Sequence, residues 1–284
     1  MTKKKPGIAG TLWNAWSWVA LHLLGMLYLV SKAILWAAGF IAGKVSARAA
    51  RGAREAQRPR TVATYAPLIL QKKSSGELER FEEKLLSSKS AIGLVLGARG
   101  SGKSALGMRL LENVFSKTGR RVCAMGFDES TLPPWIKCVG GVEDVPNGSA
   151  VLVDEGGITF SSRSSQSSAN RILSSLLLVA RHKDLSVLFI SQNSANLEVN
   201  AIRQADFLLL RKPSLLQKEF ERRKIAEIYD EIGSGFSGLP QQGEYSTYIY
   251  SDEFTGFVLN ALPSFWSQKA SKSYAHFRPK EAKA

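Results

Sequence analysis

AIGLVLGARGSGKS, residues 91–104, joins an apolar run to a glycine-rich turn that ends in a lysine and a serine. The apolar run Ala91–Leu96 has the length of a buried strand. Residues 97–104 match G-x-x-x-x-G-K-[ST], a pattern that follows a strand, cradles phosphates and opens a helix. A chance glycine-rich turn is the alternative. The strand, the turn and a helix predicted over Lys103–Ser116 nevertheless all fall where the pattern requires them.

The residue types of this turn suit a nucleoside triphosphate. Gly97 and Gly102 allow backbone angles that direct several N–H groups to one point, and the following helix adds its positive N-terminal end. Lys103 is predicted to reach the β- and γ-phosphates of ATP, and the Ser104 hydroxyl to bind Mg²⁺. The residues predicted to surround the nucleotide are Gly97, Ala98, Arg99, Gly100, Ser101, Gly102, Lys103, Ser104 and Ala105.

Two further apolar runs end in side chains suited to hydrolysis. Residues 151–153 lead into Asp154 and Glu155, and residues 187–190 lead toward Gln192. The carboxyl ends of parallel strands hold ligands in α/β sheets, so all three side chains are expected near the phosphates. Asp154 is predicted to hold Mg²⁺, Glu155 to polarise the attacking water, and Gln192 to contact the γ-phosphate or the water. A surface acid pair and a turn glutamine are the alternatives.

Arg181 is the arginine that we select as a donor to the ATP of a neighbouring subunit. It closes a helix predicted over Asn170–Ala180, where a cation is stabilising in any case, so a purely structural role is the alternative. Arg163, Arg203 and Arg211 compete for the role in trans.

Other polar groups give weaker signals. The serine-rich stretch 161–168 could contact a nucleic-acid backbone through its hydroxyls and Arg163, or could be a solvated loop. Cys123 and Cys138 are expected to be reduced thiols, which fits a cytosolic location for the main domain. The three histidines, His22, His182 and His276, have no metal-ligand spacing.

The N-terminal segment has the composition of a membrane anchor. Residues 8–43 are almost wholly apolar, long enough for one membrane-spanning helix and short for two. Trp13 and Trp36 would lie roughly 34 Å apart along a helix at about 1.5 Å per residue, close to the spacing of two bilayer interfaces. Lys32 lies near enough to one end to extend toward the interface. A cleaved signal peptide, ending near Ala47–Ala49, and a helix lying flat on the membrane are the alternatives.

The charge of the chain is concentrated beside this segment. The net charge is +14; residues 1–60 hold ten basic residues and one acid, and therefore +9 of it. The larger basic cluster follows the apolar stretch, which favours a cytoplasmic location for the remainder of the chain. An anionic membrane surface is the expected partner of the basic segment, with nucleic acid second.

The body of the chain alternates between apolar runs and helical patterns, which predicts an α/β fold with a mainly parallel sheet flanked by helices. We expect a membrane anchor over 1–43, a basic linker over 44–75, a P-loop ATPase domain over 76–266 and a disordered tail over 267–284. Near the C-terminus, two stretches in which apolar and polar residues alternate predict a β-hairpin. The predicted strands are Ala91–Leu96, Arg121–Gly126, Ala150–Asp154, Ser186–Ser191, Phe207–Arg211, Tyr245–Tyr250 and Gly256–Leu262; the other predicted helices are Gly76–Leu86 and Leu215–Ile232.

The motifs resemble those of the FtsK/HerA superfamily of P-loop motor ATPases. The resemblance covers about residues 90–212 and is carried by 97–104, 151–155, 180–192 and 202–211. It implies a ring oligomer with ATP at subunit interfaces, and translocation of DNA or extrusion of a virion. Similar small members are packaging ATPases of tailless viruses with internal membranes and zonula occludens toxin-like assembly ATPases of filamentous phages. The latter usually carry their anchor after the ATPase domain, and the DNA-tracking domain of chromosome translocases is lacking here.

Three functional hypotheses follow. The first is a single-pass membrane ATPase, with its catalytic domain in the cytoplasm or on a virion's internal membrane, that translocates or packages DNA. The second is a virion-assembly ATPase that acts on capsid or coat protein. The third is a nucleotide-dependent membrane scaffold without enzymatic activity. A small-molecule kinase is a weaker fourth hypothesis, because no arginine-bearing lid is recognisable in the sequence.

Overall fold

The computed structural model describes residues 8–161, 166–239 and 246–267. The chain divides into two compact units, Met1–Ala56 and Gln57–Ala284. Several predictions fall outside the described residues: the basic cluster Lys3–Lys5, Arg163 with residues 162–165 of its serine-rich stretch, Tyr245, and the tail after Ser267.

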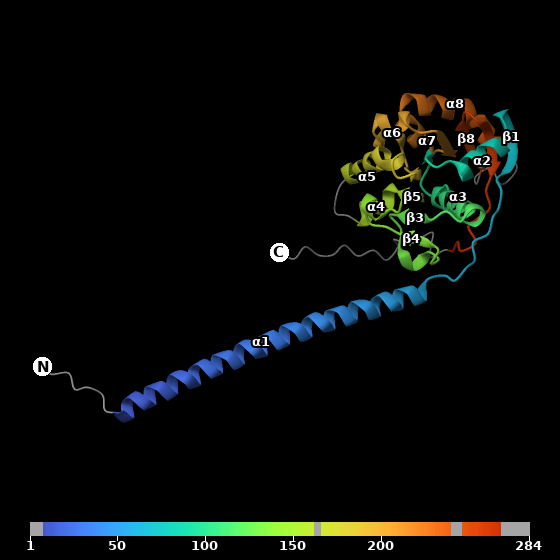
Figure 1. Ribbon diagram of the computed structural model, residues 1–284. Helices are drawn as coiled ribbons and strands as arrows, with labels where there is room; N and C mark the ends of the chain where they lie inside the picture. The colour runs from blue at the N-terminus through green and yellow to red at the C-terminus, as the bar shows by residue number, and fades with distance from the viewer. Residues whose placement is uncertain (1–7, 162–165, 240–245, 268–284) are drawn as a thin grey trace. The chain divides into compact units, whose positions relative to one another are not determined.

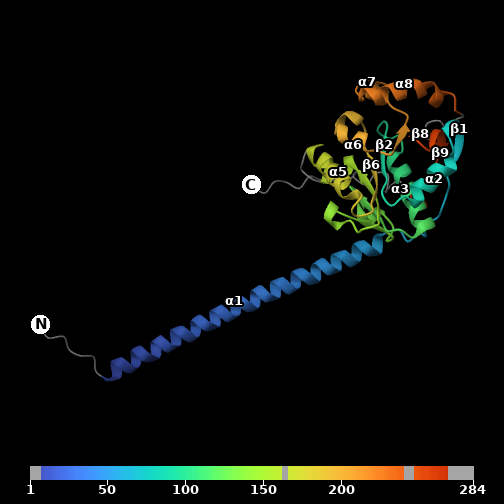
Figure 2. The same cartoon turned by 45° about the horizontal axis from the view of Figure 1, so that its top comes forward.

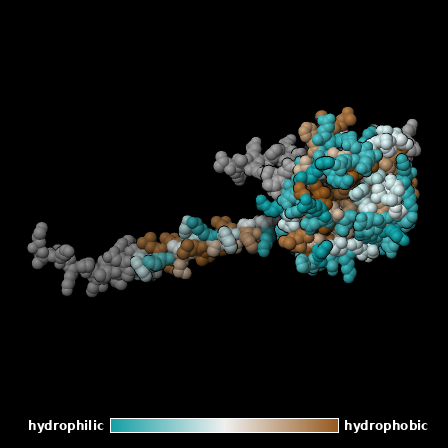
Figure 3. All heavy atoms as spheres, turned by 90° about the horizontal axis from the view of Figure 1, so that it is seen from above, coloured by the Kyte–Doolittle hydropathy of each residue, from teal (hydrophilic) through white to brown (hydrophobic). Residues whose placement is uncertain are grey.

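The first unit is one helix, α1 (Ile8–Gln57). Its window Leu21–Ser46 is exposed, has a mean hydropathy of 1.7 and is the one stretch in the described part of the chain long and apolar enough to cross a membrane. Figure 3 shows apolar side chains gathered along this helix, while the visible face of the second unit is mainly polar. Residues 44–57, where the basic linker is expected to begin, continue this helix, because their alanines and arginines favour helix as far as Pro59 allows.

The second unit is built on a nine-stranded sheet with the order β1-β9-β8-β7-β2-β6-β5-β3-β4. The six strands from β7 to β4 are parallel, and β8, β9 and β1 continue the sheet in antiparallel pairing. The predicted mainly parallel α/β fold with a C-terminal hairpin is therefore confirmed. The strands are β1 (Ile69–Gly76), β2 (Ile92–Leu96), β3 (Val122–Met125), β4 (Ile136–Cys138), β5 (Ala150–Asp154), β6 (Ser186–Ile190), β7 (Phe207–Arg211), β8 (Ser246–Ser251) and β9 (Phe254–Leu259).

Helices cover both faces of this sheet (Figures 1 and 2). Alternate residues of β2 enter opposite cores: Leu94 and Leu96 face α5 and α8, and Val95 faces α2 and α3. This is the two-residue period of a strand buried on both faces. The helices are α2 (Leu78–Ser87), α3 (Lys103–Thr118), α4 (Glu155–Ser161), α5 (Gln166–Ala180), α6 (Val199–Arg203), α7 (Leu215–Glu219) and α8 (Arg223–Ser237).

The single helix predicted over Leu215–Ile232 is wrong, because it breaks between α7 and α8. Glu221 lies in the break and is 8% exposed. Its Oε2 accepts a hydrogen bond from the Ser194 N–H at 2.7 Å, and Arg222 donates to the Ser194 carbonyl at 3.0 Å. The hydrogen bonds of Glu221 and Arg222 to Ser194 therefore interrupt the helix that the apolar periodicity predicts.

The second half of the expected linker is also wrong, because residues 58–76 belong to the folded unit. Arg58 is 6% exposed and donates to the carbonyls of Leu132, Pro133 and Ile136 at 3.0, 2.7 and 2.7 Å. β1 then pairs with β9 along the sheet edge. β1 is mostly exposed and contains QKKSSG, so it lacks the apolar alternation by which strands are recognised.

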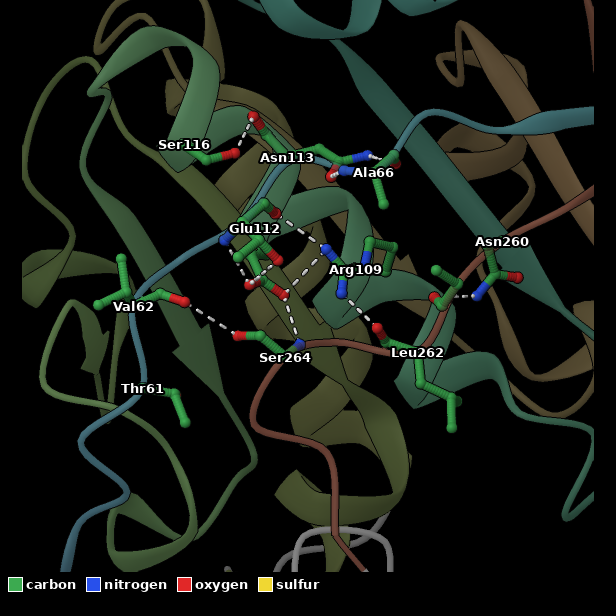
Figure 4. Close-up of polar contacts among 12 residues, drawn as sticks. Thr61, Val62, Ala66, Arg109, Glu112, Asn113, Ser116, Asn260, Leu262 and Ser264 are labelled. Atoms are coloured by element: carbon green, nitrogen blue, oxygen red, sulfur yellow. Dashed lines mark hydrogen bonds and ion pairs between the residues drawn. The ribbon is translucent and has the colours of Figure 1, made fainter.

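A buried polar cluster on α3 holds two distant segments against this helix (Figure 4). Arg109 and Glu112 form an ion pair at 3.2 Å, with side chains 3% and 0% exposed. Glu112 accepts hydrogen bonds from the N–H groups of Thr64 at 2.8 Å and Ser264 at 2.9 Å. Asn113 donates to the Ala66 carbonyl and accepts from its N–H. The helix that follows the glycine-rich turn is therefore fixed on its outer side as well as against the sheet.

Replacing Arg58 with alanine tests whether this segment is part of the domain. The change leaves buried carbonyls without their donor, so we expect a loss of about 2–4 kcal/mol and a melting temperature roughly 5–10 °C lower. Thermal unfolding of the full chain in detergent micelles measures it. Arg60→Ala, at an exposed position two residues away, is the matched control and should change little. Equal melting temperatures for both variants would contradict the docked arrangement.

Candidate nucleotide-binding site

The glycine-rich turn connects β2 to α3 with three glycines at positive φ: Gly97 at 145°, Gly100 at 79° and Gly102 at 85°. A Cβ on Gly97 would lie 2.5 Å from the Cβ of Arg211, so the turn passes directly over β7. The Ala98 N–H donates to the carbonyl of Lys212, the residue that follows β7, at 3.3 Å, which fixes the turn at the end of that strand. The first N–H groups of α3 have no intrahelical partner and suit an anion.

Lys103 begins α3 and is 7% exposed. Its Nζ donates to the carbonyls of Gly97 at 2.7 Å and Ala98 at 2.8 Å, so the ammonium group lies inside the turn. Burial lowers the pKa of Lys103 to about 8; the charge of Asp154 opposes this shift and that of Arg211 adds to it. The predicted phosphate-binding lysine is thus held within the predicted phosphate-binding turn.

Ser104 and Asp154, fifty residues apart in sequence, meet at the carboxyl edge of the sheet. The Ser104 Oγ donates to Asp154 Oδ2 at 2.9 Å, and the Gly156 N–H donates to Asp154 Oδ1 at 3.0 Å. Burial raises the pKa of Asp154, and the hydrogen bond from Ser104 partly offsets the rise. The close approach of α3 to β5 depends on Gly107 of α3, because a Cβ at this position would lie 2.5 Å from the Leu152 side chain of β5.

Glu155 is the first residue of α4 and is 7% exposed. Its Oε2 accepts a hydrogen bond from Ser191 Oγ at 2.5 Å. Burial raises the pKa of Glu155, the Ser191 hydrogen bond lowers it, and the negative charge of Asp154 raises it further. The two predicted acids therefore share one edge of the sheet with Lys103 and Ser104.

Gln192 follows β6, which lies between β2 and β5 in the sheet, so the residue is at the predicted edge. Its side chain is exposed, and its carbonyl accepts a hydrogen bond from Gln217 Nε2 of α7 at 2.5 Å. A contact between the Gln192 side chain and a γ-phosphate remains a prediction.

The candidate arginines lie in different surroundings. Arg181 is exposed in the turn before β6, so it is separated from the predicted site by the length of that five-residue strand, about 15 Å. It could act only on another copy of the chain. Arg211 is 2% exposed beneath the chain's own glycine-rich turn, where its Nη2 donates to Asn260 Oδ1 at 2.8 Å. Burial lowers the pKa of Arg211 to about 10. Because its side chain is buried within its own chain, Arg211 is excluded as the arginine that acts on the ATP of a neighbouring subunit.

The donor set fits magnesium better than a transition metal. Among the described residues no group of three His, Cys, Asp or Glu side chains is placed to hold a metal ion. A hydroxyl and a carboxylate in contact, Ser104 and Asp154, are the oxygen ligands that Mg²⁺ takes when substrate phosphates supply others.

Some residues of the site were missed from the sequence. Ser191, Asn196 and Asn260 were not predicted as site residues, and Arg211 was considered only for a role in trans. The Asn196 side chain hydrogen-bonds Glu155, and Arg211 lies below Gly102, with Nη2 3.5 Å from a Cβ built there. Ser191 could have been suspected from its place beside Gln192 at the end of a buried strand.

Comparison with known proteins finds similarity at the level of fold. No family model and no curated protein matches the chain. The DNA-packaging ATPase B204 from Sulfolobus turreted icosahedral virus matches 60% of this chain and 96% of its own, at 15% identity and a TM-score of 0.42. The pCW3 conjugation coupling protein TcpA matches 64% of this chain and 62% of its own, at 10% identity and a TM-score of 0.41. EssC from Geobacillus thermodenitrificans matches 72% of this chain and 46% of its own, at 11% identity and a TM-score of 0.41. At such low identities and TM-scores, the function has to rest on the geometry of the site.

Alanine at Gly97 and at Gly100 should have unequal effects. Both have positive φ, which costs an L-residue about 1–2 kcal/mol. Gly97→Ala also drives a Cβ into Arg211, whereas Gly100 faces open space. We expect Gly97→Ala to lower the melting temperature further and to weaken ATP binding by about tenfold or more, equivalent to 1.4 kcal/mol. Thermal unfolding and titration with fluorescent ATP measure this; equal effects of the two variants would contradict the close packing.

Proposed function

We propose that this chain is a membrane-anchored ATPase that binds ATP and Mg²⁺ at the glycine-rich turn and uses hydrolysis to translocate or package DNA. The observation that carries the enzymatic part is the meeting of Lys103, Ser104, Asp154 and Glu155 at one sheet edge, with Ser104 bonded to Asp154 at 2.9 Å. A nucleotide-binding turn alone would not require the second acid, which is buried beside the first.

The side chains divide the work of hydrolysis between them. The turn and the start of α3 would bind the phosphates, and Lys103 would exchange its two carbonyl partners for phosphate oxygens. Ser104 and Asp154 would hold Mg²⁺, which neutralises charge that develops on the transferred phosphoryl group. Glu155 would orient the attacking water and accept its proton. Gln192, at the end of the intervening strand, would contact the γ-phosphate or that water.

The proposed membrane partner is inferred from the charge and the composition of the N-terminal segment. The exposed apolar window of α1 is long enough to span a bilayer, and the basic residues that follow it suit an anionic cytoplasmic surface. DNA is proposed as the cargo, in a homo-oligomeric ring in which Arg181 serves a neighbouring site. A zonula occludens toxin-like role in assembly or extrusion, with capsid or coat protein as cargo, is the alternative.

Two substitutions separate binding from hydrolysis. Lys103→Ala should abolish turnover and weaken ATP binding, because it removes the buried cation of the turn. Glu155→Gln keeps the size of the side chain and should slow turnover by about 10²–10³-fold with little change in ATP affinity. The full chain in detergent micelles is assayed for phosphate release and for binding of fluorescent ATP. Tight binding without turnover by the wild-type chain under all conditions would favour a scaffold instead.

Cargo is distinguished by which additive stimulates ATP hydrolysis. Double-stranded DNA should raise the rate of the wild-type chain and leave Lys103→Ala inactive. Stimulation by capsid or coat protein, with no response to DNA, would contradict the DNA motor and support the assembly ATPase.

Mixing two inactive variants tests the proposed role of Arg181. If Arg181 acts on a neighbouring site, a mixture of Lys103→Ala and Arg181→Ala chains contains some interfaces with both residues intact, and activity should partly recover. The full chains are mixed in detergent and phosphate release is compared with that of each variant alone. No recovery, or an active Arg181→Ala chain, would exclude this role.

A further inference from the structure

The loop after β6, residues 191–198, lies between Glu155 and the α7–α8 corner. It contains the short 3-10 turn Ser194–Asn196. One side of the loop contacts Glu155 of α4, and the other contacts Gln217, Glu221 and Arg222. The loop therefore connects the predicted catalytic acid to a separate part of the fold.

Ser191 is the residue of this loop that contacts Glu155 most directly. It is 1% exposed, and its Oγ lies 2.5 Å from Glu155 Oε2. The same Oγ lies 2.9 Å from the Asn193 carbonyl and accepts a hydrogen bond from the Asn193 N–H at 3.3 Å. One hydroxyl has one proton, and the carboxylate is both nearer and the stronger acceptor, so the proton is directed to Glu155. The N–H of Gln192 and the side chain of Asn196 add hydrogen bonds to the same carboxyl group.

The loop is itself fixed from its outer side. Glu221 Oε2 accepts from the Ser194 N–H at 2.7 Å and also from the Ser194 hydroxyl. Arg222 donates to the carbonyls of Ser194 and Leu197. Asn170 of α5 donates to the Asn196 carbonyl at 2.8 Å. These bonds hold in one conformation the loop whose side chains contact Glu155.

We propose that Ser191 is a positioning residue for hydrolysis: with Asn196, it holds the Glu155 carboxylate in the orientation from which it acts on the attacking water. This inference rests on the proposed function. A carboxylate free to rotate about its side-chain torsions would spend less time in the productive geometry, and misplacement of a catalytic group by about 1 Å costs on the order of 10²-fold in rate. Ser191 has no predicted contact with the nucleotide, so its removal should leave substrate binding intact.

The test compares Ser191→Ala, Ser191→Thr and Asn196→Ala in the full chain. Ser191→Ala should lower kcat by about 10–100-fold with KM and ATP affinity within about threefold of the wild-type values. Ser191→Thr keeps the hydroxyl and should recover most of the rate. Asn196→Ala, which removes a different contact with the same carboxyl group, should lower kcat in the same selective way.

Ser186→Ala is the matched control, because Ser186 is a buried serine at the start of β6, the strand that Ser191 follows. Its hydroxyl donates to the Ser88 carbonyl at 3.1 Å, far from Glu155. It should lose stability through its lost hydrogen bond and keep its kcat. An unchanged or raised kcat in Ser191→Ala, an equal loss in Ser186→Ala, or a parallel loss of ATP affinity would overturn the positioning role. Absence of turnover in the wild-type chain would instead overturn the proposed function itself.

Discussion

The close packing of α3 on the sheet is the constraint on which the rest of the site depends. Gly107 lets the helix approach Leu152 of β5, where a Cβ would lie 2.5 Å from that side chain. The approach brings Ser104 to within 2.9 Å of Asp154, and it sets Lys103 beside the two acids. Because β6 lies between β2 and β5, the loop after β6 enters the same edge and meets Glu155. The close contact between helix and strand and the order of the strands together assemble residues from three parts of the chain.

The outer side of α3 is held by groups that are costly to bury. Arg109 and Glu112 are almost fully buried, and such an ion pair is stable only when its hydrogen-bonding capacity is met. Backbone groups of residues 64, 262 and 264 bond both terminal nitrogens of Arg109 and both carboxylate oxygens of Glu112 (Figure 4). The Arg109 Nε has no hydrogen-bond partner among the described residues. The segment that follows α1 and the segment that follows the hairpin are consequently both attached to the helix that begins at Lys103. The predicted nucleotide site is therefore built on an element fixed on both of its sides.

The sequence was sufficient for the parts of the fold that follow from short motifs and strong apolar patterns. β5 and β7 have the predicted bounds, and β2, β3, β6 and the C-terminal hairpin differ from prediction by at most a few residues. The predicted residues Lys103, Ser104, Asp154 and Glu155 do meet. β1 could not be predicted, because its polar residues pair at an exposed edge, and the docking of Arg58 depends on carbonyls more than seventy residues away. Ser191 was missed as a site residue, and Arg211 was considered only for a role in trans, for a similar reason: only the sheet order places them beside Glu155 and the glycine-rich turn.

A structure of the full chain determined with Mg²⁺ and a slowly hydrolysed ATP analogue tests the central claim most directly. The account predicts the triphosphate in the turn of residues 97–102, the metal on Ser104 and Asp154, and Lys103 moved from the carbonyls of Gly97 and Ala98 to phosphate oxygens. Glu155 should remain bonded to Ser191 and face the γ-phosphate. A nucleotide bound elsewhere, or a metal that does not contact Ser104 and Asp154, would contradict it.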